Sequence, residues 1–231
     1  MPIPFLLADD RKTPFPAPRT ALREPNGLLM AGANLAPERL LAAYHSGIFP
    51  WYEAGDPILW WSPDPRCVIW PKKIRIRRSL AKVLRRGDFD VTFDLAFREV
   101  IRNCGGPRRG SKGTWITDEM IEAYCRLHEL GYAHSLEVWK AHEFVGGLYG
   151  IGIGRVFIGE SMFSRVSDAS KVALVALAQC GDYDLIDCQL ETDHLLSMGA
   201  ESIGRQHYLE ALQELGGSSE NPAVRMLESA R

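Results

Sequence analysis

The chain has 231 residues, of which 46% are hydrophobic and 24% charged, and its formal net charge at pH 7 is −2. This balance is typical of a globular protein with a sizeable core, and it excludes a disordered chain, which would combine fewer apolar residues with more net charge. No apolar run approaches the roughly 20 residues that a membrane-spanning helix requires. The first ten residues also lack a basic leader before an apolar stretch, so we expect a cytoplasmic protein.

The cysteines and histidines show neither a disulfide framework nor a metal site. The five cysteines form an odd set without a Cys-x-x-Cys pair, and the six histidines are scattered. An oxidised scaffold favours even counts of cysteine, and a zinc site requires clustered ligands. We therefore expect reduced thiols and no metal.

Residues 1–65 are rich in proline and aromatic residues and poor in regular periodicity, and we expect them to form a small N-terminal domain. A short helix is predicted over residues 35–44, where Asn34 stands at the start and Gly47 follows the end. Three of the six tryptophans lie between residues 51 and 61. So many exposed rings would be costly, so these side chains belong either to a core or to the wall of a pocket.

From residue 66 onward the pattern becomes regular α/β, and we expect a second domain over residues 66–231. The predicted strands cover residues 67–70, 89–93, 133–140, 143–151, 155–160, 184–189 and 201–203. One predicted helix begins near Ser79. The other predicted helices cover residues 95–103, 117–130, 168–180, 193–198 and 207–215. This order, antiparallel strands followed by a helix and a further strand and helix, predicts an α+β fold with the mixed, largely antiparallel sheet of N-acetyltransferases.

A basic segment interrupts this otherwise balanced charge distribution. Fifteen consecutive positions hold eight cations and no acidic residue, namely Lys72, Lys73, Arg75, Arg77, Arg78, Lys82, Arg85 and Arg86. A cationic face on a nearly neutral protein indicates a polyanion bound at one place, although a solvated helix face is the alternative. We favour phosphate binding because nothing within the segment neutralises it.

The segment Leu185-Ile186-Asp187-Cys188-Gln189 places two polar groups on one face of a predicted strand. Alternation puts Asp187 and Gln189 on the same face as Leu185, whereas Ile186 and Cys188 point the other way. Burying an ionised carboxylate is costly unless it is paired or hydrogen-bonded. The pair is therefore either a polar strand end that anchors a loop or the centre of an active site.

Residues 146–165 form a glycine-rich segment that surrounds Glu160. The segment lacks the Gly-Lys-Ser/Thr ending of a nucleotide P-loop and the Gly-x-Gly-x-x-Gly order of a dinucleotide site. Because Glu160 lies next to Met162 and Phe163, an apolar environment either raises its pKa or demands a cationic partner such as Arg165. The sequence leaves both alternatives open.

Trp115 follows a loop that carries Arg108, Arg109 and Lys112. A tryptophan beside cations is suited to stacking on a nucleobase. The alternative is a tryptophan that fills the junction between the two domains.

Seven segments taken together, in this order, resemble the bacterial leucyl/phenylalanyl-tRNA–protein transferases. They are Arg23-Glu24-Pro25-Asn26-Gly27-Leu28-Leu29, Gly47-Ile48-Phe49-Pro50-Trp51-Tyr52, Trp60-Trp61-Ser62-Pro63-Asp64-Pro65-Arg66, Gly113-Thr114-Trp115-Ile116-Thr117, His134-Ser135-Leu136-Glu137-Val138-Trp139, Gly159-Glu160-Ser161-Met162-Phe163-Ser164 and Leu185-Ile186-Asp187-Cys188-Gln189. The resemblance covers about residues 20 to 210 and leaves the two ends of the chain unassigned.

The resemblance implies an enzyme that moves Leu or Phe, and Met less efficiently, from aminoacyl-tRNA to a protein beginning with Arg or Lys. The product would be degraded through the N-end rule pathway. It also implies a small N-terminal domain followed by an N-acetyltransferase-like (GNAT-type) domain, in agreement with the strand order. An aminoacyl ester is already activated, so we expect no cofactor; we also expect a monomer that does not bind membranes.

The resemblance also assigns roles to residues at the matching positions. It places the terminal adenosine of the tRNA against Trp51 and Trp115. It places the aminoacyl pocket at Phe157, Glu160, Phe163 and Ser164. For catalysis it implies Asp187 and Gln189. We hypothesise that the Gln189 carbonyl oxygen accepts a hydrogen bond from the attacking amine, while Asp187 orients and polarises this arrangement and assists proton removal.

Two rival functions fit parts of the pattern. An acetyl-CoA-dependent N-acetyltransferase would normally carry a glycine-containing loop before its cofactor helix, but residues 164–169 contain no glycine. A non-catalytic RNA-binding module would account for the basic segment and leave the Asp187 and Gln189 face unexplained.

Overall fold

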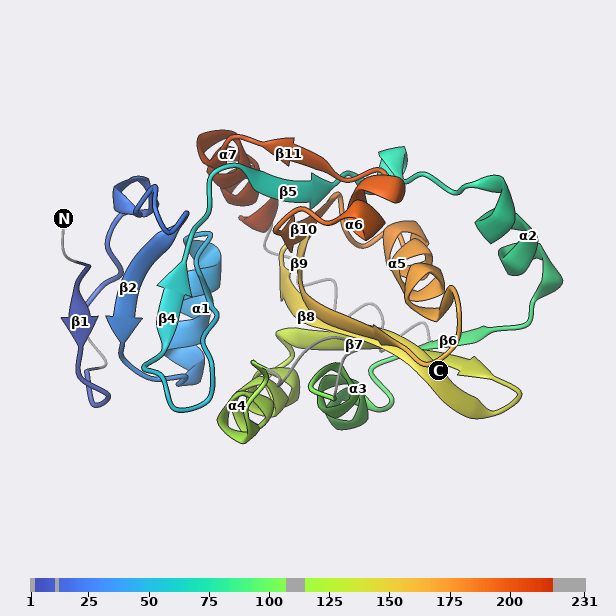
Figure 1. Ribbon diagram of the computed structural model, residues 1–231, viewed down its shortest axis with the longest axis horizontal. Coiled ribbons are helices and arrows are strands. Elements are labelled where there is room, and N and C mark those ends of the chain that lie inside the picture. Colours follow the sequence, from blue (N-terminus) through green and yellow to red (C-terminus); the bar gives the residue numbers. More distant parts are fainter. Residues whose placement is uncertain (1–2, 11–12, 107–114, 218–231) are drawn as a thin grey trace.

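The computed structural model describes residues 3–10, 13–106 and 115–217. Within these ranges the chain folds into two β-sheets with helices packed around them (Figure 1). No helix in the described part of the chain has the length and apolar character to cross a membrane. None of the five cysteines forms a disulfide.

The N-terminal region forms a small four-stranded sheet that the sequence pattern did not predict. Its order is β1-β2-β4-β3, with only β1 and β2 parallel. The strands are β1 (Phe5–Leu6), β2 (Leu28–Gly32), β3 (Phe49–Pro50) and β4 (Leu59–Trp61). Strands of two to five residues are too short to produce a readable alternation. The predicted helix of this region is present as α1 (Pro37–His45), after a 3-10 turn η1 (Pro18–Thr20).

The larger sheet has seven strands in the order β11-β5-β10-β9-β8-β7-β6. Only β9 and β10 pair in parallel, which confirms the prediction of a mixed, largely antiparallel sheet. The strands are β5 (Arg66–Ile69), β6 (Asp90–Phe93), β7 (Ala133–Lys140), β8 (Glu143–Ile153), β9 (Val156–Ser164), β10 (Leu185–Gln189) and β11 (Glu201–Ile203). All lie where they were predicted, but β9 continues four residues beyond the predicted end at Glu160.

The helices of the C-terminal part also follow the predicted order. They are α2 (Arg78–Arg86), α3 (Phe97–Cys104), α4 (Asp118–Glu129), α5 (Ala169–Gln179), α6 (Asp193–Ser197) and α7 (Arg205–Gly216), with a 3-10 turn η2 (Pro71–Lys73) before α2. The predicted cap of α4 is confirmed, because the Thr117 hydroxyl accepts a hydrogen bond from the Met120 N–H. The last helix begins at Arg205, two residues before its predicted start.

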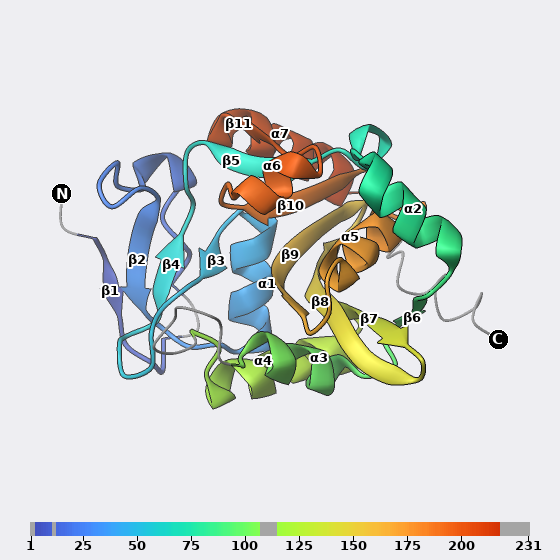
Figure 2. The same ribbon diagram turned by 45° about the vertical axis from the view of Figure 1, so that its right-hand side comes forward.

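The two faces of the large sheet carry two separate hydrophobic cores. Helices α3 and α4 cover one face and α5 covers the other (Figures 1 and 2). Buried side chains of the small sheet and α1, such as Trp60 and Tyr44, belong to the same core as Phe97 of α3 and Tyr124 of α4. The two sheets therefore share one core, and the domain boundary at residue 65 stays a prediction.

An extra residue in β9 opens the sheet next to β10. Strand β8 pairs Tyr149 with Ser161 but Gly150 with Gly159, so Glu160 has no partner on β8 and forms a bulge. On its other side, β9 pairs with β10 only as far as Ile158 and Asp187. The two strands then diverge, and the residues that follow on each line the resulting opening.

Gly150 should be required for this bulge. A Cβ atom at Gly150 would lie 2.6 Å from the Phe157 ring and closer still to the Ile158 carbonyl oxygen, both on the neighbouring β9. We expect Gly150→Ala to lower the free energy of unfolding by about 1 to 3 kcal/mol, as overpacking does. Urea denaturation would measure this, with Gly204→Ala as the control because a Cβ there meets nothing within 4 Å. Equal midpoints for the two variants would show that the bulge does not require a glycine at position 150.

Candidate active site

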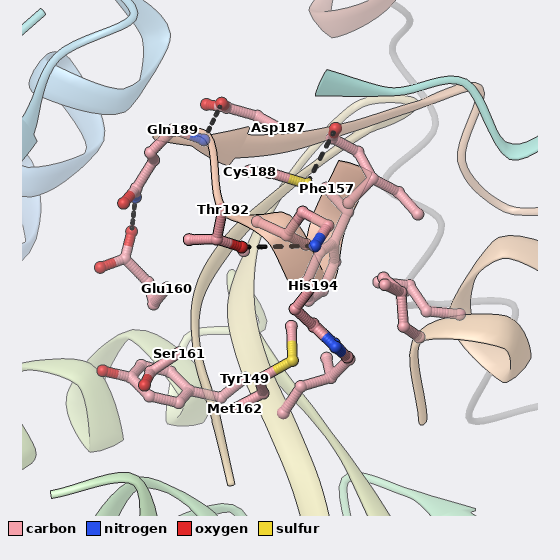
Figure 3. Close-up of a pocket in the computed structure, with 16 residues that line it drawn as sticks. Tyr149, Phe157, Glu160, Ser161, Met162, Asp187, Cys188, Gln189, Thr192 and His194 are labelled. Carbon is pink, nitrogen blue, oxygen red and sulfur yellow. Dashed lines mark hydrogen bonds between the residues drawn. The ribbon is translucent and has the colours of Figure 1, made fainter. Parts of the chain in front are cut away.

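A pocket of about 230 Å³ lies where β9 and β10 diverge, against α5 and α6 (Figure 3). Most of its wall is apolar and is formed by Leu148, Phe157, Met162, Leu174, Leu177, Ile186 and Leu195. Glu160 and Gln189 supply polar groups on the two diverging strands. A mostly apolar wall with a few polar groups is suited to binding a small apolar side chain.

Gln189 occupies an unusual backbone position at the end of β10. Its φ of 62° lies in the left-handed region that non-glycine residues rarely adopt, and the register with β5 shifts between Asp187 and Gln189. The side-chain Nε2 donates to Glu160 Oε1 at 2.9 Å, and the backbone N–H donates to Asp187 Oδ1 at 2.9 Å (Figure 3). Cys188 packs against the core on the α5 side of the sheet, on the face opposite to the Asp187 carboxylate as alternation predicted, but it lines the pocket as well.

Asp187 is completely buried and its carboxylate is surrounded by donors. Arg66 of β5 donates from Nε to Oδ1 at 2.8 Å and from Nη2 to Oδ2 at 2.7 Å, which is a bidentate ion pair. The Tyr208 hydroxyl of α7 donates to Oδ2 at 2.7 Å. With the Gln189 N–H, four donors bind this carboxylate, so it is held in one orientation.

The guanidinium of Arg66 is equally confined. It lies between the rings of Phe49 and Tyr208, with its carbon 4.8 and 4.6 Å from their centroids, and Nη1 donates to the Gly47 carbonyl at 3.2 Å. Burial opposes the charged form of Arg66, but the Asp187 carboxylate outweighs it and raises the pKa of the guanidinium above its ordinary value. The Asp187 carboxylate therefore favours the charged form of the buried guanidinium.

Glu160 differs from Asp187 in that its hydrogen-bond partners are neutral side chains. Tyr44 of α1 donates to Oε1 at 2.8 Å and Tyr124 of α4 to Oε2 at 3.2 Å, while the two hydroxyls also contact each other. Burial raises the pKa of Glu160 to about 7, although these hydroxyls and the Gln189 amide oppose the shift. Of the two alternatives left open by the sequence, the raised pKa is correct; Arg165 instead donates to Asn103.

Two residues predicted for the aminoacyl pocket lie outside it. Phe157 lines the pocket, but Phe163 packs on the other face of the sheet, with its ring 5.1 Å from that of Phe144. Ser164 ends β9 and accepts a hydrogen bond from the Ser170 N–H at 2.9 Å. The bulge explains the error, because one extra residue inverts the alternation and brings Met162 into the pocket in place of Phe163.

The two tryptophans assigned to adenosine lie apart from the pocket lining. Trp51 directly follows β3, is 42% exposed, and has its ring 5.7 Å from that of Trp61. Trp115 is half-buried against the core shared by the two sheets. No ring contact between Trp51 and Trp115 occurs in the described part of the chain, and the basic loop 108–112 lies outside it.

The basic segment is exposed, but some of its cations have acidic neighbours that the sequence did not reveal. All eight cations are exposed, and α2 lies at the end of the molecule away from the small sheet (Figures 1 and 2). Three of the eight have acidic neighbours, because Lys72 lies 3.9 Å from Asp184, Lys73 3.5 Å from Glu201 and Arg86 2.9 Å from Asp88. Among the described residues, the cations without such a partner are Arg75, Arg77, Arg78, Lys82 and Arg85.

Sequence reasoning did not identify four residues that complete the site. Arg66, Tyr208, Tyr44 and Tyr124 all hold the two acids in place. Arg66 could have been found, because an arginine that begins a strongly apolar strand requires an acidic partner. The three tyrosines carried no signal, since a tyrosine on an amphipathic helix is usually a core residue.

The Asp187–Arg66 pair should be essential for stability. We expect Asp187→Ala to lower the free energy of unfolding by about 3 to 5 kcal/mol, because it leaves a buried guanidinium without its counter-charge. Asp184→Ala is the matched control, since it removes a neighbouring aspartate from a half-buried, solvent-accessible pair with Arg155 and should cost about 1 kcal/mol or less. Similar losses in guanidinium chloride titrations of the two variants would contradict the assignment.

Comparison with known proteins agrees with the sequence resemblance. A family model described as leucyl/phenylalanyl-tRNA protein transferase matches residues 68–213, and the model of its N-terminal domain matches residues 33–64. Among solved structures, a GCN5-related N-acetyltransferase from Kribbella flavida aligns with a TM-score of 0.37 at 10% identity, over 76% of this chain and 63% of that one.

Curated relatives cover most of the chain. The leucyl/phenylalanyl-tRNA–protein transferase of Stutzerimonas stutzeri (strain A1501) is 59% identical over 86% of this chain and 89% of its own length. The protein of the same name from Azoarcus sp. (strain BH72) is 60% identical over 86% of each chain. With these identities over nearly the whole described length, the chain belongs to the leucyl/phenylalanyl-tRNA protein transferase family.

Proposed function

We propose that this chain transfers Leu or Phe, and Met less efficiently, from aminoacyl-tRNA to the α-amine of a protein that begins with Arg or Lys. The observation that carries the proposal is the apolar pocket between β9 and β10 with the Gln189 amide beside it. The product would enter the N-end rule pathway of degradation. The enzyme would act as a monomer in the cytoplasm, where aminoacyl-tRNA is made.

The pocket supports the choice of amino acid. Its aliphatic, aromatic and thioether walls can take up the side chains of Leu, Phe or Met and remove them from water. An anionic side chain would lose its hydration there without gaining a partner of opposite charge, and for a cationic one the carboxylates of Glu160 and Asp187 are already bound by donors of the protein. The pocket therefore selects apolar aminoacyl groups by the cost of desolvation.

The reaction requires few groups because the aminoacyl ester is already activated. An uncharged amine must be held about 3 Å from the ester carbonyl carbon, and the proton that it loses needs an acceptor. In our proposal the Gln189 carbonyl oxygen accepts a hydrogen bond from this amine. The amine then attacks the ester carbon, the new amide bond forms, and the bond to the tRNA ribose oxygen breaks as that oxygen takes up a proton.

Asp187 would act on Gln189 and not on the amine. Its carboxylate already accepts hydrogen bonds from Arg66, Tyr208 and the Gln189 N–H. Each of its two oxygens already accepts two hydrogen bonds from within the protein, so the role in proton removal considered from sequence is not part of the proposal. Asp187 is instead a positioning residue, which holds the left-handed backbone of Gln189 through its N–H.

The tRNA would extend along the molecule. The exposed ring of Trp51 offers a stacking surface for the terminal adenosine, and we retain Trp115 as its partner. The unpaired cations of α2 and the preceding turn would bind phosphates at the far end, beyond the pocket. A ligand that reaches both regions must be long, as an acceptor stem is.

The test of the proposed function is direct transfer. The protein is incubated with labelled Phe-tRNA and an acceptor that begins with Arg, with the same acceptor beginning with Gly as the control. We expect label in the first acceptor only, and a loss of about 100-fold in kcat for Gln189→Ala, since misplacing a reacting group typically costs that much. Transfer from acetyl-CoA but not from Phe-tRNA would instead indicate an N-acetyltransferase.

The salt dependence of tRNA binding tests the basic segment. The triple variant Arg78→Gln, Lys82→Gln and Arg85→Gln should weaken binding and flatten the dependence of log Kd on log salt, by about 0.7 to 0.9 for each phosphate that is no longer neutralised. A matched triple variant on α3 and α4 changes Arg98, Arg102 and Arg126 to Gln and should leave the slope unchanged. Filter binding across a salt series measures both; equal slopes would refute phosphate binding by α2.

A further inference from the structure

The proposed reaction requires one orientation of the Gln189 carboxamide, and Gln189 alone does not fix that orientation. A carboxamide carries an acceptor oxygen and a donor NH2 group of similar size, and rotating it exchanges the two. The attacking amine needs the oxygen, because the NH2 group would meet it donor to donor. Some other group must therefore fix the orientation of the Gln189 amide.

Glu160 is bonded to one end of this amide. The Gln189 Nε2 lies 2.9 Å from Glu160 Oε1 (Figure 3). An ionised carboxylate has only acceptor atoms, so it can bond to the NH2 end and not to the oxygen. With the NH2 end occupied in this way, the Gln189 oxygen has no hydrogen-bond partner among the described residues.

Glu160 can impose this orientation because it is itself held in place. The bulge directs its side chain toward α1 and α4, where the hydroxyls of Tyr44 and Tyr124 bind one carboxylate oxygen each. Only 8% of the residue is exposed, so water competes little for these bonds. Two helices that are far apart in the sequence thus fix an acid that lines the pocket.

We infer that Glu160 is a positioning residue for the transfer reaction, which holds the Gln189 amide with its NH2 group turned away and its carbonyl oxygen left for the attacking amine. The inference rests on the proposed function of Gln189. It assigns Glu160 a task distinct from lining the aminoacyl pocket, because the effect of Glu160 on the reaction passes through Gln189.

A double-mutant cycle separates this task from a direct contact with substrate. We expect Glu160→Gln to lower kcat about ten-fold or more with a near-constant KM for Phe-tRNA, because the introduced amide can present its own NH2 to Gln189. In a Gln189→Ala background the same change should have little further effect, since the group on which it acts is gone. Glu137→Gln is the matched control, as Glu137 is also a fully buried glutamate but lies outside the pocket lining.

The inference would be overturned if the loss in kcat of the double variant equalled the product of the losses of Glu160→Gln and Gln189→Ala. It would also be overturned if Glu160→Gln raised KM and left kcat unchanged. Thermal unfolding of each variant shows whether Glu160→Gln is folded. If a variant is too slow or too unstable for the cycle, a pH titration of the Gln189 amide signals in the wild-type protein tests the inference.

The side-chain amide signals of Gln189 in a ¹H–¹⁵N NMR spectrum test the contact without tRNA. They are identified by their absence in Gln189→Ala. Since the pKa of Glu160 is about 7, these signals should titrate with a midpoint near 7 in the wild type and should lose that titration in Glu160→Gln. The two tyrosines that contact Glu160, Tyr44 and Tyr124, have pKa values raised by burial, and the pKa of Arg66 is raised by Asp187, so none of the three changes charge in this range. The second carboxylate near Glu160, Asp187, is bonded to Arg66.

Gln189 amide signals that do not shift with pH in the wild type, or that still titrate in Glu160→Gln, would overturn the inference. The two proposals fail separately. If labelled Phe is not transferred but the amide signals titrate as expected, the proposed function is wrong and the contact between Glu160 and Gln189 stands. If transfer occurs and the signals do not titrate, only the role of Glu160 fails.

Discussion

A buried carboxylate in a sheet must be matched by a cation and by enough hydrogen-bond donors, and at Asp187 this requirement connects β5, β10, α7 and the N-terminal region. Removing two such charges from water costs several kcal/mol each, and only close geometry recovers that cost. Arg66 provides the charge from β5, and Tyr208 provides a donor from α7. Arg66 also binds the Gly47 carbonyl of the N-terminal region, so the pair joins the small sheet to the large one.

The same interaction sets the geometry of the candidate site. The Gln189 N–H that bonds to Asp187 stabilises a left-handed backbone that would otherwise be unfavourable for glutamine. This turn brings the Gln189 side chain to Glu160, whose environment contains neutral donors instead of a cation. Two buried acids a short distance apart therefore differ in character: Asp187 is paired with a guanidinium, whereas Glu160 has neutral partners and burial brings its pKa to about 7.

The sequence predicted the large sheet well because its elements carry strong periodic signals. Strands β5 to β11 and helices α2 to α7 all lie within a few residues of their predicted positions. The strand alternation also placed Asp187 and Cys188 on opposite faces correctly. The small sheet was missed because its strands pair through two to five residues each, and pairing between such short segments depends on contacts distant in sequence.

The errors at the site have the same origin. Neither the partners of Glu160 on α1 and α4 nor the acidic neighbours of Lys72 and Lys73 are close to them in sequence. A linear pattern shows which side chains need partners but not where the fold supplies them. Local reasoning about Glu160 therefore proposed the nearby Arg165, whereas the structure provides two tyrosines from other helices.

A single inserted residue explains why pocket and hydrogen-bond network occur together. In a regular strand, Phe157 and Phe163 would share one face. The bulge at Glu160 inverts the alternation, so Phe157 and Met162 line the apolar pocket while Glu160 meets the tyrosines on the opposite side. One strand thereby supplies both the apolar wall of the pocket and the carboxylate that binds the Gln189 amide. A change that removed the bulge would move both at once, which is why the substrate pocket and the orientation of Gln189 are structurally linked.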